Sequence, residues 1–224
     1  MSIFTFEPPS VKSSFAFDSP NLTRRSPLDR SSSDSLAESR RERPLEVKKY
    51  HFRRREYVLL DKGIFWQIES GVVRSLTHDE TGKLIPLGFW GTGDIVGQPS
   101  AEVGAYQIEC LTNVIAYALP EGYRYPQDMA FSQVRQMEEL LVIMHSGSIE
   151  KRLIQFLIWM AKKFGSRTTQ GWLIDLRLTH QDIADVIGTS RVTTTRILNK
   201  MQQDGIIHWS RKRNILLSNS FAVA

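Results

Sequence analysis

Hydrophobic and polar positions alternate with a helical period on both sides of Gly188, between residues 178 and 203. Apolar residues three and four positions apart share one face of an α-helix, so each half of this stretch predicts a short helix with one buried side. Gly188 stands at the junction, where a tight turn requires a residue without Cβ strain. The apolar faces consist of Ile183, Ala184 and Ile187 in the first helix, and of Ile197 and Leu198 in the second.

Polar residues mark where both helices begin and where the second one ends. Thr179 with Asp182 forms a capping signature, and Ser190 is placed to cap the second helix. Gly205 follows that helix, as helix-ending glycines do. Two short helices joined by a glycine turn are typical of a DNA-binding helix-turn-helix, although Thr194 occupies a position that is usually apolar. An ordinary helical hairpin with exposed arginines is the alternative interpretation.

A helix-turn-helix places the N-terminal residues of its second helix against base edges in the major groove. The residues expected to read bases are Arg191, Val192, Thr193, Thr195 and Arg196. Arg196 is the first candidate for a bidentate contact with guanine, because a guanidinium presents two parallel donors. The residues expected to contact DNA phosphates are Thr179, His180, Ser190, Lys200, Arg211, Lys212 and Arg213.

Residues 206–217 read I-I-H-W-S-R-K-R-N-I-L-L, which predicts two short strands around a basic tip. Such a hairpin after a helix-turn-helix is a wing. Its tip would lie along phosphates and add affinity without sequence information. A solvated charge cluster is the alternative.

The pattern before these helices consists of short apolar runs separated by glycine-containing turns, from Tyr57 to Pro120. Closely spaced antiparallel strands of this kind predict a compact roll. The runs are residues 56–60, 64–76, 84–90, 91–97 and 106–119.

A helical period begins near Pro126 and forms an apolar seam. We expect the seam to pack against the same helix of a second copy, and packing against the roll is the alternative. Ser146 to Ser148 should interrupt the helix as a hinge, and Ser148 can cap a second helix over residues 149–164. The seam consists of Val134, Met137, Leu141 and Met144.

These elements predict an α+β protein with four segments. Residues 1–47 are rich in Ser, Pro and Arg without either period, and we expect this tail to be disordered. The basic run at 48–55 could contact DNA or a partner, or form a solvated face. A roll is expected over 48–125, a dimerisation helix over 126–147 and a winged helix-turn-helix over 148–224.

Composition narrows the class of protein. The chain has 224 residues, 41% of them hydrophobic and 24% charged, enough for two modest cores, and its net charge of +5 suits a polyanionic partner. No run is long and apolar enough to span a membrane, and the first residues lack the pattern of a secretory signal, so we expect a cytoplasmic protein. The single cysteine, Cys110, is expected to be a small buried hydrophobe.

The sequence contains no pattern that is typical of a catalytic or metal-binding site. The five histidines form no i, i+3 or i, i+4 pair and lie beside no carboxylate cluster at ligand spacing. We therefore expect no metal, no required cofactor and no enzyme activity. The histidines are His51, His78, His145, His180 and His208.

The order roll, long helix, hinge and winged helix-turn-helix resembles the Crp/Fnr family of transcription regulators, over about residues 50–217. The C-terminal motifs R-L-I-Q-F-L-I-W-M-A-K-K-F-G and L-T-H-Q-D-I-A-D-V-I-G-T-S-R-V-T-T-T-R-I-L are similar to the NtcA-type nitrogen regulators of that family. The resemblance implies a cyclic-nucleotide-binding-like β-roll, a homodimer on double-stranded DNA with a palindromic operator, and contact with RNA polymerase through the loop Ser166–Gly171. Val192 replaces a glutamate of the cyclic-AMP receptor, which implies an NtcA-like half-site read by Arg191, Val192 and Arg196.

The same resemblance bears on the effector. Members that bind cyclic nucleotides hold the phosphate with an arginine inside an interval that here, between Lys83 and Arg124, contains no Lys or Arg, which argues against cyclic AMP. NtcA-type members bind 2-oxoglutarate with arginines at positions occupied here by Gly104 and Gln133, while the acidic partner remains as Glu138. 2-Oxoglutarate is therefore a candidate that lacks its usual arginines. Candidate effector residues are Asp94, Ile95, Val96, Gly97, Gln98, Gln133 and Glu138, and a purely structural turn is the alternative.

The sequence thus predicts a homodimeric, sequence-specific transcription regulator with a diverged sensor roll. The alternative is a ligand-binding regulatory module that acts mainly through protein partners. The two differ in whether DNA binding discriminates between sites.

Overall fold

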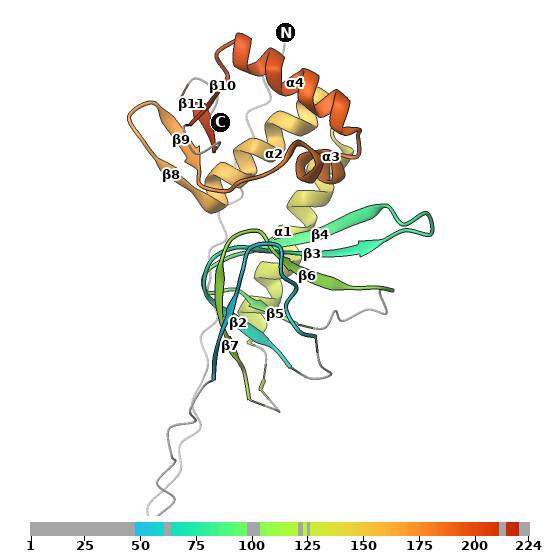
Figure 1. The fold of residues 1–224 in the computed structure, drawn as a ribbon, viewed down its shortest axis with the longest axis vertical. Helices are drawn as coiled ribbons and strands as arrows, with labels where there is room; N and C mark the ends of the chain where they lie inside the picture. Colours follow the sequence, from blue (N-terminus) through green and yellow to red (C-terminus); the bar gives the residue numbers. More distant parts are fainter. Residues whose placement is uncertain are drawn as a thin grey trace, which may run out of the picture. The chain divides into compact units, whose positions relative to one another are not determined.

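The structure is a computed structural model that describes residues 48–60, 64–97, 104–120, 123–124, 126–210 and 214–219 (Figure 1). The expected tail over residues 1–47 and the basic tip of the wing, Arg211 to Arg213, lie outside the described residues.

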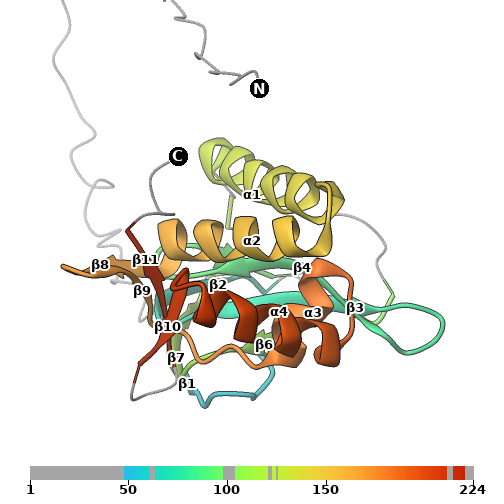
Figure 2. The ribbon, with the colours of Figure 1, turned by 90° about the horizontal axis from the view of Figure 1, so that it is seen from above.

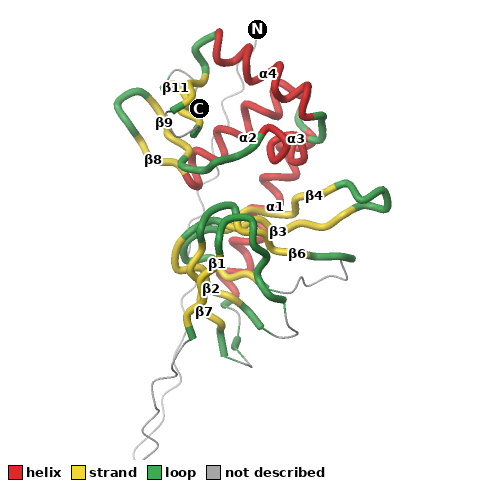
Figure 3. Tube along the Cα trace, in the orientation of Figure 1, coloured by secondary structure: helices red, strands yellow, loops and turns green. Residues whose placement is uncertain are grey.

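Two antiparallel sheets form the roll, and their strands are drawn in yellow in Figure 3. One sheet has the order β1-β7-β2-β5 and the other the order β4-β3-β6. The strands are β1 (Lys49–Phe52), β2 (Trp66–Ser70), β3 (Val73–His78), β4 (Leu84–Trp90), β5 (Ile95–Val96), β6 (Gln107–Cys110) and β7 (Val114–Ala118).

β1 belongs to the roll and not to a separate basic segment. It pairs with β7, with Tyr50 opposite Ala116. Tyr50 and Phe52 point to the same face and pack edge-on against Trp66, with ring centroids 4.8 and 5.6 Å from the indole. Alternating aromatic side chains therefore hold the first half of the predicted basic run on the sheet.

The run 56–60 does not form the strand that its apolar pattern predicts. It makes only an isolated bridge, Tyr57 with Glu109, and the backbone N–H of Val58 donates to Ile108 at 2.9 Å. At Leu59 the carbonyl oxygen instead accepts the indole N–H of Trp66 at 2.9 Å. The segment therefore leaves the β-ladder after Val58.

Cys110 is fully buried inside the roll, as predicted from the sequence. Burial raises the pKa of its thiol to about 12, and the nearby carboxylates of Glu56 and Glu109 act in the same direction. Because the thiolate is the reactive form, we expect the native protein to resist iodoacetamide at about pH 8 and to react only after unfolding. Mass spectrometry of the alkylated protein tests this, and stoichiometric labelling of the native protein would contradict it.

Two helices follow the roll, α1 (Gln127–His145) and α2 (Ile149–Phe164), and α2 packs against both α1 and α3 (His180–Ile187) (Figure 2). Ser148 caps α2 as predicted, accepting the N–H of Lys151. Gly147 has a φ of 42° at the joint, where the side chain of Arg152 donates to the carbonyls of Ser146 and Gly147. Within the described part of the chain, no helix is long and apolar enough to cross a membrane.

The C-terminal part contains a four-stranded antiparallel sheet, of order β10-β11-β9-β8, and two helices. The elements are β8 (Gly165–Arg167), β9 (Gly171–Ile174), α3 (His180–Ile187), α4 (Arg191–Gln203), β10 (Ile207–Trp209) and β11 (Ile215–Ser218). Pairing of β10 with β11 confirms the predicted strands of the wing.

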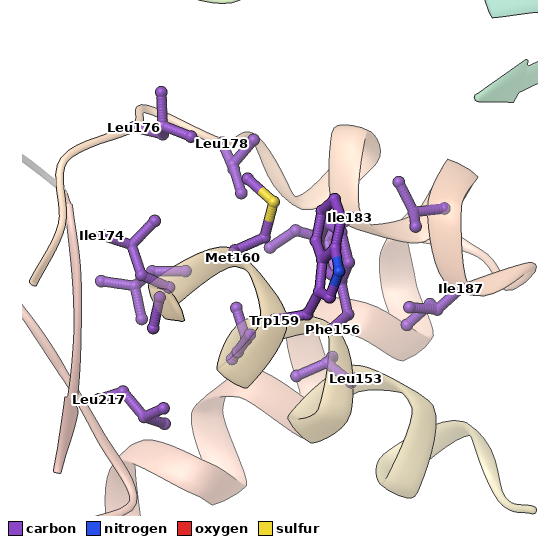
Figure 4. Close-up of a cluster of buried hydrophobic side chains, with 14 of the residues drawn as sticks. Leu153, Phe156, Trp159, Met160, Ile174, Leu176, Leu178, Ile183, Ile187 and Leu217 are labelled. Carbon is purple, nitrogen blue, oxygen red and sulfur yellow. The ribbon is translucent and has the colours of Figure 1, made fainter. Parts of the chain in front are cut away.

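Two hydrophobic cores are present among the described residues, and the larger one crosses the boundary between the predicted segments. The smaller core lies within the roll around Trp66 and Ile108. The larger core joins Phe89 of the roll to Leu140 of α1, to α2 and to the C-terminal sheet and helices. Figure 4 shows its centre, where Phe156, Trp159 and Met160 of α2 lie among side chains of the C-terminal part. Burial of this continuous apolar surface favours contact between the roll and the C-terminal part.

Candidate nucleic-acid interface

α3 and α4 form the helix-turn-helix that the sequence predicts. Thr179 and Asp182 make the reciprocal capping box, and Ser190 caps α4 by accepting the N–H of Thr193 at 3.2 Å. Gly188 has a φ of 71° at the turn and Gly205 a φ of 69° after α4, conformations that favour glycine. The predicted apolar faces are buried, and Ala184 is fully enclosed where the helices meet.

One side of α4 is open. Arg191, Val192 and Arg196 are exposed along it, and Val192 keeps 79% of its surface accessible. Ile197, Leu198 and Met201 bury the opposite side. An exposed valine between two arginines is of little use to the fold, whereas a major groove offers it a thymine methyl group and offers the arginines guanine acceptors.

Two of the five predicted base-reading residues have their hydroxyl groups engaged within the protein. Thr193 bonds the side chain of Ser190 at 3.0 Å. Thr195 donates to the carbonyl of Arg191 at 2.9 Å and lies 2.7 Å from Nδ1 of His180. These contacts position the start of α4, so Arg191, Val192 and Arg196 are the base-reading candidates that face outward.

Thr194 is fully buried, and its hydroxyl has no hydrogen-bond partner among the described residues. The departure from an apolar residue noted in the sequence therefore leaves a polar group unpaired in the core, at a cost of about 1–3 kcal/mol.

Four of the seven predicted phosphate-contacting residues, Thr179, His180, Ser190 and Lys200, lie in the described part of the chain. Thr179 and His180 are at the start of α3, and Ser190 precedes α4. Burial, and then the charge of Arg191, lower the pKa of His180. Lys200 forms an exposed ion pair with Glu150 at 3.0 Å. The remaining three, Arg211, Lys212 and Arg213, lie outside the described residues.

A buried ion-pair cluster that no sequence signal predicts joins α3 to the roll. Arg55 donates to both Glu109 and Asp182, at 2.8 and 2.7 Å. Arg74 lies 2.7 Å from Glu109 and 3.2 Å from Asp182. The residues of this ion-pair cluster are Arg55, Arg74, Glu109 and Asp182.

The cluster balances two positive with two negative side chains in an interior where an unpaired charge is very unfavourable. Arg74, Glu109 and Asp182 are only 3, 5 and 4% exposed. Burial alone would raise the pKa of Asp182, but hydrogen bonds from Arg55 and Thr179 more than offset it, so the pKa is below its usual value. Arg55 itself has a φ of 73°, a strained conformation for a residue with a Cβ. Asp182 thus both caps α3 and attaches it to the roll.

α1 carries an exposed apolar stripe on the side away from the core. Leu140 and Ile143 face the core and are buried. Of the predicted seam, Val134, Met137 and Leu141 lie on the stripe, but Met144 is half-buried and packs against the larger core. The stripe consists of Phe131, Val134, Met137, Leu141 and Val142.

The candidate effector residues are brought together only in part. Gln133 of α1 donates to the carbonyl of Ile95, so it does lie across from the predicted turn.

The predicted effector turn is closed by its own hydrogen bonds. The side chain of Asp94 accepts the N–H of Gly91 at 2.8 Å. A Cβ at Gly97 would lie 2.6 Å from the ring of Phe65, so the turn is also closely packed. Ile95 and Val96 are buried and Glu138 is exposed on α1, whereas Gln98 lies outside the described residues.

A winged helix-turn-helix with an exposed, arginine-bearing helix, attached to a β-roll through two further helices, defines a DNA-binding regulator. The class follows from the fold and from the open side of α4 together.

Comparisons with known proteins agree with this class. The model of the Crp-like helix-turn-helix domain matches residues 151–220. The regulatory protein CysR of Synechococcus elongatus is 40% identical over 158 residues, which are 69% of this chain and 77% of CysR. The global nitrogen regulator of the same organism is 35% identical over 82 residues, 37% of each chain.

Solved structures share the fold. FixK2 from Bradyrhizobium japonicum superposes with a TM-score of 0.66 at 20% identity, over 80% of this chain and 99% of FixK2. A transcriptional regulator of the CRP family from Thermus thermophilus gives a TM-score of 0.64 at 22% identity, over 77% of this chain and 96% of that protein.

The chain belongs to the Crp/Fnr family of transcription regulators. The family resemblance seen in the sequence is thereby confirmed, and the similarity to CysR covers more of the chain than the similarity to the nitrogen regulator.

Proposed function

We propose that two copies of this protein read a palindromic operator, each placing α4 in the major groove. The observation that carries the proposal is the open side of α4, where Arg191, Val192 and Arg196 are exposed while the opposite side is buried. Recognition helices of a symmetric dimer enter successive major grooves about 34 Å apart, so the half-sites should be one helical turn apart.

The dimer contact in this proposal is the exposed stripe of α1. A row of large apolar side chains on one helix loses its contact with water when a second copy covers it. The stripe is also the part of α1 that the protein's own core leaves open.

Arg196 is the proposed reader of one guanine, and its replacement tests the assignment. Arg196→Ala should lower affinity for the operator by about 1–3 kcal/mol and relax the preference at one position of each half-site. Lys212→Ala should weaken binding to all sequences alike and reduce the slope of log K against log salt by about one per subunit. Binding isotherms on matched and substituted operators at several salt concentrations measure both. Identical behaviour of the two variants would refute the base-reading role of Arg196.

The proposal includes no required cofactor and no cyclic AMP in the roll. In support, the buried Arg74 of the roll is paired with Glu109 and Asp182, so its charge is already compensated by protein groups. 2-Oxoglutarate is the small molecule to test at the Asp94–Gln98 turn, with Gln133 opposite. By analogy with the family, the protein would act in the cytoplasm and contact RNA polymerase near Ser166–Gly171. This segment includes the last two residues of β8, the connection at residues 168–170 and the first residue of β9, so only its middle is a loop.

A further inference from the structure

A cavity of about 920 Å³ that is lined by arginines lies beside the helix-turn-helix. One of its lining residues, Arg54, comes from the segment that follows β1 of the roll. Arg177 comes from the chain before α3, and Arg191 from the first turn of α4. Among the described residues that line it, none carries a carboxylate. The lining is Arg54, Arg177, Leu178, Thr179, His180, Gln181, Arg191 and Trp209.

Arg54 is held in a fixed position by neutral groups. Its Nε donates to the carbonyl of Leu111 at 3.0 Å, and its Nη2 donates to the carbonyl of Arg177 at 2.8 Å. These carbonyls orient the guanidinium without neutralising its charge. A side chain fixed in this way loses little further entropy when it binds an anion.

The positive charges around the cavity repel one another. Burial, followed by the charges of Arg55 and Arg177, lowers the pKa of Arg54, with Asp182 opposing the change. Burial, and after it the charge of Arg191, lowers the pKa of His180. A nearby anion would relieve this repulsion, and the start of α3 adds the positive end of a helix dipole.

A smaller neighbouring cavity of about 380 Å³ shares Arg54 and Arg177 but differs in charge. Its lining includes Asp175, whose carboxylate accepts a hydrogen bond from Asn214. The larger cavity is therefore the one suited to an anion. The lining of the larger cavity also includes Trp209, and the centroid of its ring lies 5.8 Å from that of the His180 ring.

We propose that the larger cavity is an oxyanion site that binds a tetrahedral group of the phosphate type. Arg54 would contact this group from outside the helix-turn-helix. Two sources share this chemistry: a backbone phosphate of the bound DNA, and a free phosphate or sulfate ion. The DNA source rests on the proposed function, because Thr179, His180 and Arg191 are then contacts of the same duplex. The free-ion source does not depend on it.

The test compares Arg54→Gln with Arg53→Gln, which removes the same charge from the neighbouring exposed residue that does not line the cavity. Affinity is measured by fluorescence anisotropy on the selected operator and on a scrambled duplex, between about 50 and 300 mM salt, a range over which each phosphate contact changes the affinity several-fold. Sodium phosphate and sodium sulfate are titrated calorimetrically into the same proteins without DNA.

If DNA supplies the phosphate, Arg54→Gln lowers affinity for both duplexes by the same factor and reduces the salt slope by about one per subunit, while Arg53→Gln does so much less. If a free ion is the ligand, the wild-type protein binds phosphate or sulfate saturably and Arg54→Gln loses this binding. Equal effects of the two variants on DNA affinity, without saturable ion binding, would overturn the proposal, as would unchanged binding in both arms.

Arg54→Lys separates charge from structure, since lysine keeps the charge but cannot reproduce both carbonyl hydrogen bonds. An anion site predicts that this variant retains most of the salt slope. A lysine variant as defective as the glutamine variant, with a lowered melting temperature, would assign Arg54 a structural role instead. Absence of specific DNA binding by the wild-type protein would count against the proposed function, and not against the ion arm.

Discussion

Leu141→Asp is expected to convert the protein to a monomer and to abolish specific operator binding. Leu141 lies on the exposed stripe of α1, where a carboxylate would be buried between two copies without a partner. A monomer contacts only one half-site, so the affinity gained from two linked half-sites is lost. Sizing chromatography with light scattering, followed by binding assays on the full palindrome, measures both effects.

Ser132→Asp provides the matched control, because Ser132 is an exposed polar residue on the same helix outside the stripe. It introduces the same charge and should leave a dimer that binds DNA normally. A Leu141→Asp protein that remains dimeric would show that α1 is not the dimer contact. Met137→Asp should reproduce the effect of Leu141→Asp, since Met137 lies on the same stripe.

Asp182→Asn is expected to lower the free energy of unfolding by about 3–5 kcal/mol, the range found when one partner of a buried ion pair is removed. The substitution keeps the shape of the side chain but leaves Arg55 and Arg74 with Glu109 as the remaining carboxylate of the ion-pair cluster. Urea unfolding at neutral pH measures the change. Asp185→Asn on the same helix is the control and should change stability by no more than about 0.5 kcal/mol. Equal stability of the two variants would contradict a stabilising role for the cluster.

The pH dependence of stability gives a second readout for Asp182. The pKa of this carboxyl is lowered in the folded protein, so its contribution is present at neutral pH, above the unfolded value of about 3.9. The contribution is lost as the pH falls through the folded pKa, because the unfolded chain binds the proton more readily. Below about pH 4 the wild-type protein should therefore progressively lose its advantage over Asp182→Asn, and a constant difference down to about pH 2 would contradict this.

The helix-turn-helix could be predicted from the sequence because its signals are local. Thr179 and Asp182 are three residues apart, Gly188 determines the turn, and the apolar face follows the helical period. Each signal reports a physical requirement within one or two helical turns, and the structure satisfies all of them.

The ion-pair cluster and the cationic cavity could not be predicted because they bring together distant parts of the chain. Arg55 and Asp182 are 127 positions apart, and no periodicity links them. The basic run that contains Arg54 and Arg55 reads as one surface feature in the sequence, yet the chain places Tyr50 and Phe52 in a sheet, Arg55 in the cluster and Arg54 at the cavity.

The hydrophobic pattern of α1 predicted a helix correctly but not all of its contacts. A period of three and four residues identifies which side chains share a face, and it does not distinguish a face covered by a second copy from one covered by the same chain. Met144 is at the edge of the predicted seam, and the larger core reaches it there because the chain turns back at Ser146 to Ser148.

Selection of bound sequences from a randomised duplex library, at near-physiological salt and with or without 2-oxoglutarate or cyclic AMP, tests the central claim most directly. Two copies that each insert α4 in a major groove should enrich a palindrome whose half-sites are one helical turn apart. Dependence of that enrichment on either small molecule would identify a working sensor. Absence of enrichment under every condition would contradict sequence-specific reading by α4 and favour a module that acts through protein partners.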